Sequence, residues 1–189
     1  MIRIAVLASG SGTNAENIIR YFEKNKSVKV TAVISNRKKA KVLERASNLN
    51  VSSYYFDKNE FFEGEKVVTL LSEKADFVIL AGFLLKIPLN ILTAFPNKII
   101  NIHPALLPKY GGKGMYGMHV HNAVKAENEK ETGITIHYVN ENYDEGAVIF
   151  QATTPVRLED SAEDIAKNIH VLEQKHFPQV IESVLLKKE

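Results

Sequence analysis

Short apolar runs alternate with longer segments of helical period through the first half of the chain, and this alternation constrains the fold most strongly. Apolar runs rich in Val, Ile and Leu and joined by helices are typical of parallel strands buried on both faces. Strands are expected at 2–7, 28–35, 51–55, 76–81 and 98–102, and helices at 14–24, 39–48, 59–73 and 89–94. The pattern predicts an α/β fold with a doubly wound, mostly parallel, Rossmann-like sheet.

The second half of the chain has a different pattern. Segments 132–139 and 147–156 alternate or run apolar on either side of the turn-forming sequence Asn-Glu-Asn-Tyr-Asp-Glu-Gly. They predict an antiparallel hairpin added to the sheet, with a long connecting loop. A C-terminal helix is expected over 161–186, capped by Asp160 or Ser161. Without repeats or an obvious linker, we expect one domain over 1–189.

Composition narrows the class of protein. The 189 residues carry a formal net charge of +2 and no cysteine, which excludes disulfides, thiolate metal sites and cysteine nucleophiles. So small a charge gives no reason to expect nucleic-acid binding. The first apolar run leads directly into a glycine-rich turn, which is unlike a signal peptide, and no apolar run is long enough to span a bilayer. We expect a cytoplasmic protein without a membrane or nucleic-acid partner.

The first expected strand ends in the sequence Ser-Gly-Ser-Gly-Thr-Asn-Ala, which places Gly10 and Gly12 before a helix that Thr13 or Asn14 is expected to cap. Glycines let a backbone approach a ligand closely, and a helix N-terminus favours an anion. A dinucleotide site would also need an acid after the second strand, where Arg37 and other polar residues stand instead. The turn therefore binds one substrate phosphate, holds a 2′-phosphate dinucleotide through Arg37, or is only a tight turn; we favour the first.

Asn101 and His103 follow the fifth apolar run. Residues two apart in an extended segment point to the same side, and Pro104 keeps His103 extended. An amide and an imidazole on one face are suited to stabilising an oxyanion and moving a proton. Burial would suppress the charge of such a histidine, and a carboxylate nearby would restore it. Asp144, in the hairpin loop, is the candidate.

The remaining histidines give weaker signals. His119 and His121 have no third ligand at a recognisable spacing, so we interpret them as first-turn helix residues near a pocket and expect no metal. His137 shares a strand face with Thr135. His170 and Glu173 lie three apart on the last helix and so share a face, either on the surface or at the phosphate site.

The motifs Asn-Ile-His-Pro-Ala-Leu-Leu-Pro-Lys-Tyr, Ser-Gly-Ser-Gly-Thr-Asn, Leu-Ala-Gly-Phe and Tyr-Asp-Glu-Gly-Ala-Val-Ile occur in an order that strongly resembles the formyl-folate transferase family. The resemblance covers nearly the whole chain and is strongest to members that act in purine biosynthesis. It implies transfer of the formyl group of 10-formyltetrahydrofolate to the amine of glycinamide ribonucleotide. Both are small molecules, and the protein would be a monomer or homodimer.

The resemblance also implies residue roles. Asn101 and His103 would stabilise the oxyanion, with Asp144 setting the charge of His103 and ordering a water. The nucleotide phosphate and ribose would be held by Gly12, Thr13, Asn14, His170 and Glu173. Folate would be bound by Leu84, Leu85, Lys86, Ile87, Asn101, Asn140, Glu141, Asn142 and Tyr143.

The chain departs from the family pattern in several places. His170 stands where the family usually has Gln, and Leu84-Leu85 stands where many members have Met-Arg. Asn59 falls near a position where an Arg often contacts folate, and the loop at 110–118 is longer than the common form. Related formyltetrahydrofolate hydrolases and tRNA formyltransferases carry an extra regulatory or tRNA-binding domain, so a small-substrate transferase is favoured. An NADP-binding reductase would leave Asn101, His103 and Asp144 unexplained.

Overall fold

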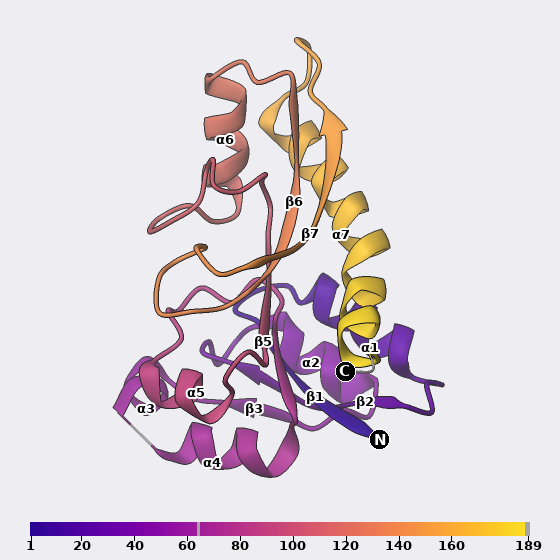
Figure 1. Cartoon of the computed structure of the whole chain (residues 1–189), viewed down its shortest axis with the longest axis vertical. Coiled ribbons are helices and arrows are strands. Elements are labelled where there is room, and N and C mark those ends of the chain that lie inside the picture. The colour runs from indigo at the N-terminus through magenta and orange to yellow at the C-terminus, as the bar shows by residue number, and fades with distance from the viewer. Residues whose placement is uncertain (64, 188–189) are drawn as a thin grey trace.

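In the computed structural model, which describes residues 1–63 and 65–187, a single mixed sheet runs through the molecule (Figure 1). Its strands are β1 (Ile2–Leu7), β2 (Val28–Ser35), β3 (Ser53–Tyr55), β4 (Phe77–Leu80), β5 (Ile99–His103), β6 (Glu131–Tyr138) and β7 (Val148–Pro155). They lie in the order β3-β2-β1-β4-β5-β6-β7. The first five strands pair in parallel, and β6 and β7 add an antiparallel hairpin to β5. The expected doubly wound, mostly parallel sheet with an added hairpin is confirmed.

Helices cover both faces of the sheet (Figure 1). They are α1 (Thr13–Phe22), α2 (Lys41–Asn48), α3 (Lys58–Glu63), α4 (Glu65–Lys74), α5 (Leu89–Ala94), α6 (Met118–Ala126) and α7 (Ala162–Leu185). One buried cluster joins the sheet to α1, α2, α6 and α7, and a second joins it to α3, α4 and α5. Successive strand residues point to opposite faces, so Ile99 belongs to the second cluster and Ile100 to the first.

The C-terminal helix crosses the sheet and packs on α1. Ser161 is its N-cap and forms a capping box with Asp164, so of the two caps expected from the sequence Ser161 is the one used. Asn17 Nδ2 donates to the carbonyl of Gln174, 2.8 Å away, which fixes one helix against the other. No helix among the residues described is long and apolar enough to cross a membrane.

Two helical regions differ from expectation. Where one helix was expected over 59–73, the structure has α3 and α4; Gly64, between them, lies outside the described residues. Helix α6 was anticipated only through His119 and His121, because its glycine-rich approach gives no helix-start signal. At the last parallel strand, β5 pairs with β4 on one side and β6 on the other, so Asn101 has Leu80 and His137 as neighbours.

Candidate active site

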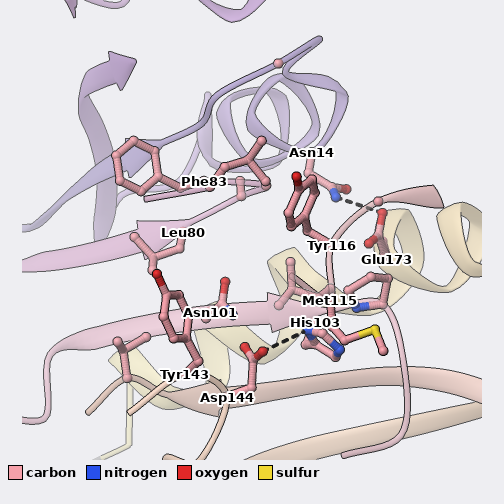
Figure 2. A pocket seen from close by; sticks show the side chains of 18 of the residues that line it. Asn14, Leu80, Phe83, Asn101, His103, Met115, Tyr116, Tyr143, Asp144 and Glu173 are labelled. Carbon is pink, nitrogen blue, oxygen red and sulfur yellow. Dashed lines mark hydrogen bonds and ion pairs between the residues drawn. The ribbon is translucent and has the colours of Figure 1, made fainter. Parts of the chain in front are cut away.

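A cavity of about 590 Å³ opens at the carboxyl edge of the parallel strands (Figure 2), the expected place for a ligand in this fold. Its size suits a small-molecule or cofactor site. Six regions line it: the turn after β1, the segment after β4, the end of β5 with the loop before α6, α6 through His121, the end of β6 with the β6–β7 connection, and α7. Residues of segments 9–14, 81–88 and 101–108, each of which follows or ends a parallel strand, all contribute to its wall.

Asn101 and His103 enter this cavity from β5, as their spacing predicts. His103 is only 3% exposed, and its Nε2 lies 2.8 Å from the carbonyl oxygen of Tyr110. A carbonyl only accepts, so Nε2 carries a proton and Nδ1 is the nitrogen left for chemistry. Nδ1 lies 3.6 Å from Oδ2 of Asp144.

Asn101 is oriented by His137, a residue of the neighbouring strand. Nδ1 of His137 is 2.8 Å from the carbonyl of Tyr138 and therefore carries the proton, which leaves Nε2 as an acceptor. Nδ2 of Asn101 donates to this Nε2 across 3.0 Å. The amide is thereby fixed, with its second N–H and its Oδ1 free to act on a ligand.

Asp144 closes the group from the β6–β7 connection (Figure 2). Its backbone has a φ of 58°, and its Oδ2 accepts a hydrogen bond of 2.9 Å from the amide of Gly112. Oδ1 lies 3.7 Å from Nε2 of His137, so the carboxylate stands between two imidazoles. The structure thus brings together Asn101, His103 and Asp144, although 43 positions separate Asn101 from Asp144 in the sequence.

The charge state of His103 differs from the sequence expectation. Burial lowers the pKa of His103 below its usual value, and this effect outweighs the opposing influence of Asp144 and of the Tyr110 carbonyl. The expectation that the carboxylate restores the charge is therefore wrong for the resting protein. At neutral pH His103 is a neutral base, with Asp144 placed to stabilise it once it gains a proton.

The glycine turn forms the opposite wall of the cavity. Gly12 is the N-cap of α1 with a φ of 77°, and no side chain caps the helix, so the expectation that Thr13 or Asn14 does so is wrong. A Cβ on Gly12 would lie 2.5 Å from the Cβ of Val42, so only glycine fits. The turn therefore presents bare amide groups and a helix N-terminus to the cavity, an arrangement suited to an anion.

Asn14 is used instead to join the turn to α7. Its Nδ2 donates to Oε2 of Glu173 across 2.8 Å, and its Oδ1 accepts from Nε2 of Gln174 across 2.7 Å. His170 Nδ1 lies 3.4 Å from the same Glu173 oxygen, and that carboxylate raises the pKa of His170. Gly12, Thr13, Asn14, His170 and Glu173 all line the cavity, so the residues expected at the phosphate and ribose converge.

The residues expected at folate form the remaining end of the cavity. Leu84, Leu85, Lys86, Ile87, Asn140, Asn142 and Tyr143 line it with Asn101. Glu141 is exposed and does not line it, which corrects its expected place: its neighbours in the loop face inward instead. Lys86 Nζ lies 5.8 Å from the centre of the Tyr143 ring.

Arg37 is exposed and does not line the cavity. This position argues against the alternative in which Arg37 holds the 2′-phosphate of a dinucleotide.

Two buried histidines of the cavity wall had no predicted role. His137 orients Asn101, and its only sequence signal was a histidine within the expected strand 132–139. His121 lines the cavity from α6, whereas His119 is exposed.

Across residues 1–63 and 65–187, no group of three or more His, Asp or Glu side chains is arranged to hold a metal ion.

Comparison with known proteins points to one family. The model of the formyl transferase family matches residues 2–181. The chain is 35% identical to the phosphoribosylglycinamide formyltransferase of Bacillus subtilis over 191 residues, which covers 98% of this chain and 95% of that protein. It is 36% identical to the chloroplastic enzyme of that name from Vigna unguiculata, covering 96% of this chain but spanning 60% of the relative's length.

Solved structures that resemble this chain are also named as formyltransferases or transformylases. The crystal structure of phosphoribosylglycinamide formyltransferase from Bacillus halodurans superimposes with a TM-score of 0.88 at 36% identity, covering 99% of this chain and 97% of the other. Glycinamide ribonucleotide transformylase 1 from Geobacillus kaustophilus gives a TM-score of 0.89 at 33% identity, covering 98% and 99%. The similarity therefore includes the whole sheet and every element that lines the cavity.

Proposed function

Since this chain belongs to the formyl transferase family, we propose that it transfers the formyl group of 10-formyltetrahydrofolate to the amine of glycinamide ribonucleotide. The products are formylglycinamide ribonucleotide and tetrahydrofolate, as in de novo purine biosynthesis. The relatives with a matching name and near-complete mutual coverage support this choice of substrates.

One observation carries the proposal. A neutral, buried His103 stands beside Asn101 and Asp144 in the same cavity as the glycine turn and Glu173. An anion site and a proton-transfer site therefore share one space. A ribonucleotide that carries a phosphate at one end and a nucleophilic amine at the other has groups that match both sites. The folate formyl group would lie between the amine and Asn101.

The residues supply the proton transfers and charge stabilisation that the reaction needs. The amine nitrogen forms a bond to the formyl carbon, and the electron pair of the C=O bond moves to oxygen. The free N–H of Asn101 donates to this oxyanion. The bare Nδ1 of His103 takes the proton that the amine loses. When the oxyanion collapses, the bond from the formyl carbon to N10 of the folate breaks, and N10 receives the proton.

Asp144 acts through His103 in this scheme. Its carboxylate is 3.6 Å from Nδ1, too far for a direct hydrogen bond but close enough to favour the imidazolium that forms during transfer. The family resemblance implies that the carboxylate also orders a water near the reacting atoms. Protein groups complete this chemistry alone, so turnover is expected to survive a metal chelator.

An assay with purified protein tests the proposal. Loss of the 10-formyl group is followed with and without glycinamide ribonucleotide, in the presence of a chelator, and the formylated product is identified by mass. We expect loss that requires the amine and matches product one to one. Equal loss without the amine would indicate a hydrolase, and no loss with either mixture would reject the formyl-transfer proposal.

A further inference from the structure

His121 is a buried residue of the cavity wall that the proposed reaction does not use. It lies in α6 and is 6% exposed. Its Nδ1 is the one side-chain nitrogen or oxygen in the described part of the chain that is fully buried without a hydrogen-bond partner. Buried polar atoms in native proteins almost always have a hydrogen-bond partner, so a ring nitrogen without one beside a ligand cavity indicates a functional role.

The unpaired Nδ1 settles which nitrogen carries the proton. A buried N–H without an acceptor is rarer and less favourable than a buried acceptor without a donor. Burial also lowers the pKa of His121, so the ring is neutral at physiological pH. With Nδ1 bare, the single proton sits on Nε2. This nitrogen forms no hydrogen bond within residues 1–63 and 65–187 and is not fully buried, so it gives the cavity a free donor.

The position of the ring indicates which part of a substrate this donor meets. His121 lines the same cavity as Glu173 and His103, so it can contact a substrate that spans the ribonucleotide end and the proton-transfer end. In glycinamide ribonucleotide, the ribose would lie at Glu173 and the amine at His103. The one acceptor between them that belongs to neither end is the amide carbonyl oxygen of the glycinamide.

We propose that the Nε2–H of His121 donates a hydrogen bond to this amide carbonyl and so aims the amine at the formyl carbon. The inference rests on the proposed function and adds a specificity-determining contact to it. A donor at this point favours a substrate with a carbonyl one carbon from the attacking amine. A ribonucleotide with a plain aminoalkyl group would leave the donor unpaired and would be a poor substrate.

Two substitutions at this position separate the contact from folding. His121→Leu keeps a helix-compatible apolar side chain and removes the donor, while His121→Gln places an amide N–H near the former Nε2. We expect His121→Leu to raise KM for glycinamide ribonucleotide about tenfold or more, equivalent to the loss of one good hydrogen bond. His121→Gln should recover part of that loss. Affinity for the folate cosubstrate, measured by calorimetry, should stay within about twofold.

Thermal unfolding checks the fold of each variant. Because His121→Leu removes an unpaired buried nitrogen, its melting temperature should match or exceed that of the parent protein. His119→Gln, on the exposed side of the same helix, is the matched control and should leave KM unchanged. A folded His121→Leu protein with an unchanged KM for the amine, or with only folate binding weakened, would overturn the inference.

The substrate itself provides a second test. An analogue with the glycinamide carbonyl reduced to a methylene should lose much of its kcat/KM with the parent protein and little more with His121→Leu, since the two changes remove the same contact. Independent, additive losses would reject the contact. If the unmodified protein did not formylate glycinamide ribonucleotide at all, the proposed function would fail first, so the two failures are distinguishable.

Discussion

Oδ2 of Asp144 lies 3.6 Å from Nδ1 of His103, within reach of its charge but outside hydrogen-bond distance. The same oxygen is held by the amide of Gly112, so the carboxylate is fixed before any ligand binds. This relationship makes Asp144 a positioning residue for the proton on His103. Its effect belongs to the step in which the imidazole is charged, which separates its role from that of a ligand contact.

Asp144→Asn should therefore lower kcat by about 100-fold or more, the usual contribution of positioned proton transfer, with little change in folate affinity. The uncharged amide no longer favours the imidazolium, so the apparent pKa of the basic group in the rate profile should fall further. Steady-state kinetics across pH measures both effects. Asp160→Asn, whose side chain accepts from the Arg157 amide outside the cavity, is the charge-matched control. Normal turnover in Asp144→Asn would remove the carboxylate from the mechanism.

The free energy of unfolding should decrease as the pH falls below about 6.5, the usual histidine pKa. Burial lowers the pKa of His103, His121 and His137 in the folded state. The unfolded chain therefore binds protons first, and their binding favours unfolding; His170, whose pKa Glu173 raises, acts in the opposite sense. Urea unfolding at several pH values measures the slope.

His121→Leu supplies the control for this pH dependence. Removing one of the three buried neutral imidazoles should make the slope between about pH 5 and 6.5 shallower. A stability curve that stays flat over that range in the parent protein would show that these histidines are charged or exposed when folded.

Gly12→Ala should destabilise the protein and weaken binding of the amine substrate. The residue has a φ of 77°, which costs about 1–2 kcal/mol for a side chain, and its new methyl group would meet Val42. Gly10→Ala is the matched control in the same turn, because a methyl group there meets no atom within 4 Å. Denaturant unfolding should separate the two variants, and equal stability would contradict the close approach of the turn to α2.

Ser161→Ala should lower the free energy of unfolding by about 1 kcal/mol, the usual value of an N-cap, because it breaks the capping box of α7. Ser183→Ala, which removes a bond to the Val180 carbonyl of the same helix, should change it by less than about 0.5 kcal/mol. Since His170 and Glu173 lie several turns from the cap, kcat and KM should remain near normal. A cap variant with impaired substrate binding would show that fraying of α7 reaches the site.

The sequence pattern was enough to predict most of the sheet. The expected strands 2–7 and 28–35 coincide with β1 and β2, because continuous apolar runs bounded by polar residues have few other solutions in a buried sheet. Helix α6 was not predicted directly, since its preceding loop lacks a capping residue. The cap of α1 was assigned to Thr13 or Asn14 because propensity favours them, whereas close packing against Val42 requires Gly12 in the left-handed region.

The chemistry of the site was predictable only where residues are near in sequence. Asn101 and His103 share a strand, so their common face follows from the strand period. The roles of His137 and His121 depend on long-range geometry: the antiparallel register of β6 sets His137 opposite Asn101, and the packing of α6 buries His121. The charge of His103 could not be predicted from the sequence, because burial lowers its pKa while Asp144 raises it, and only the structure shows that burial is the larger effect.

The order in which the site residues occur along the chain has a consequence for biosynthesis. A nascent chain that has reached β5 already contains the glycine turn, Asn101 and His103, yet Asp144 and Glu173 are still to be made. The parallel half alone would therefore have no activity. Recovery of enzyme turnover during refolding reports assembly of the complete site, with the β6–β7 connection and α7 in place, and formation of the parallel strands is not sufficient for it.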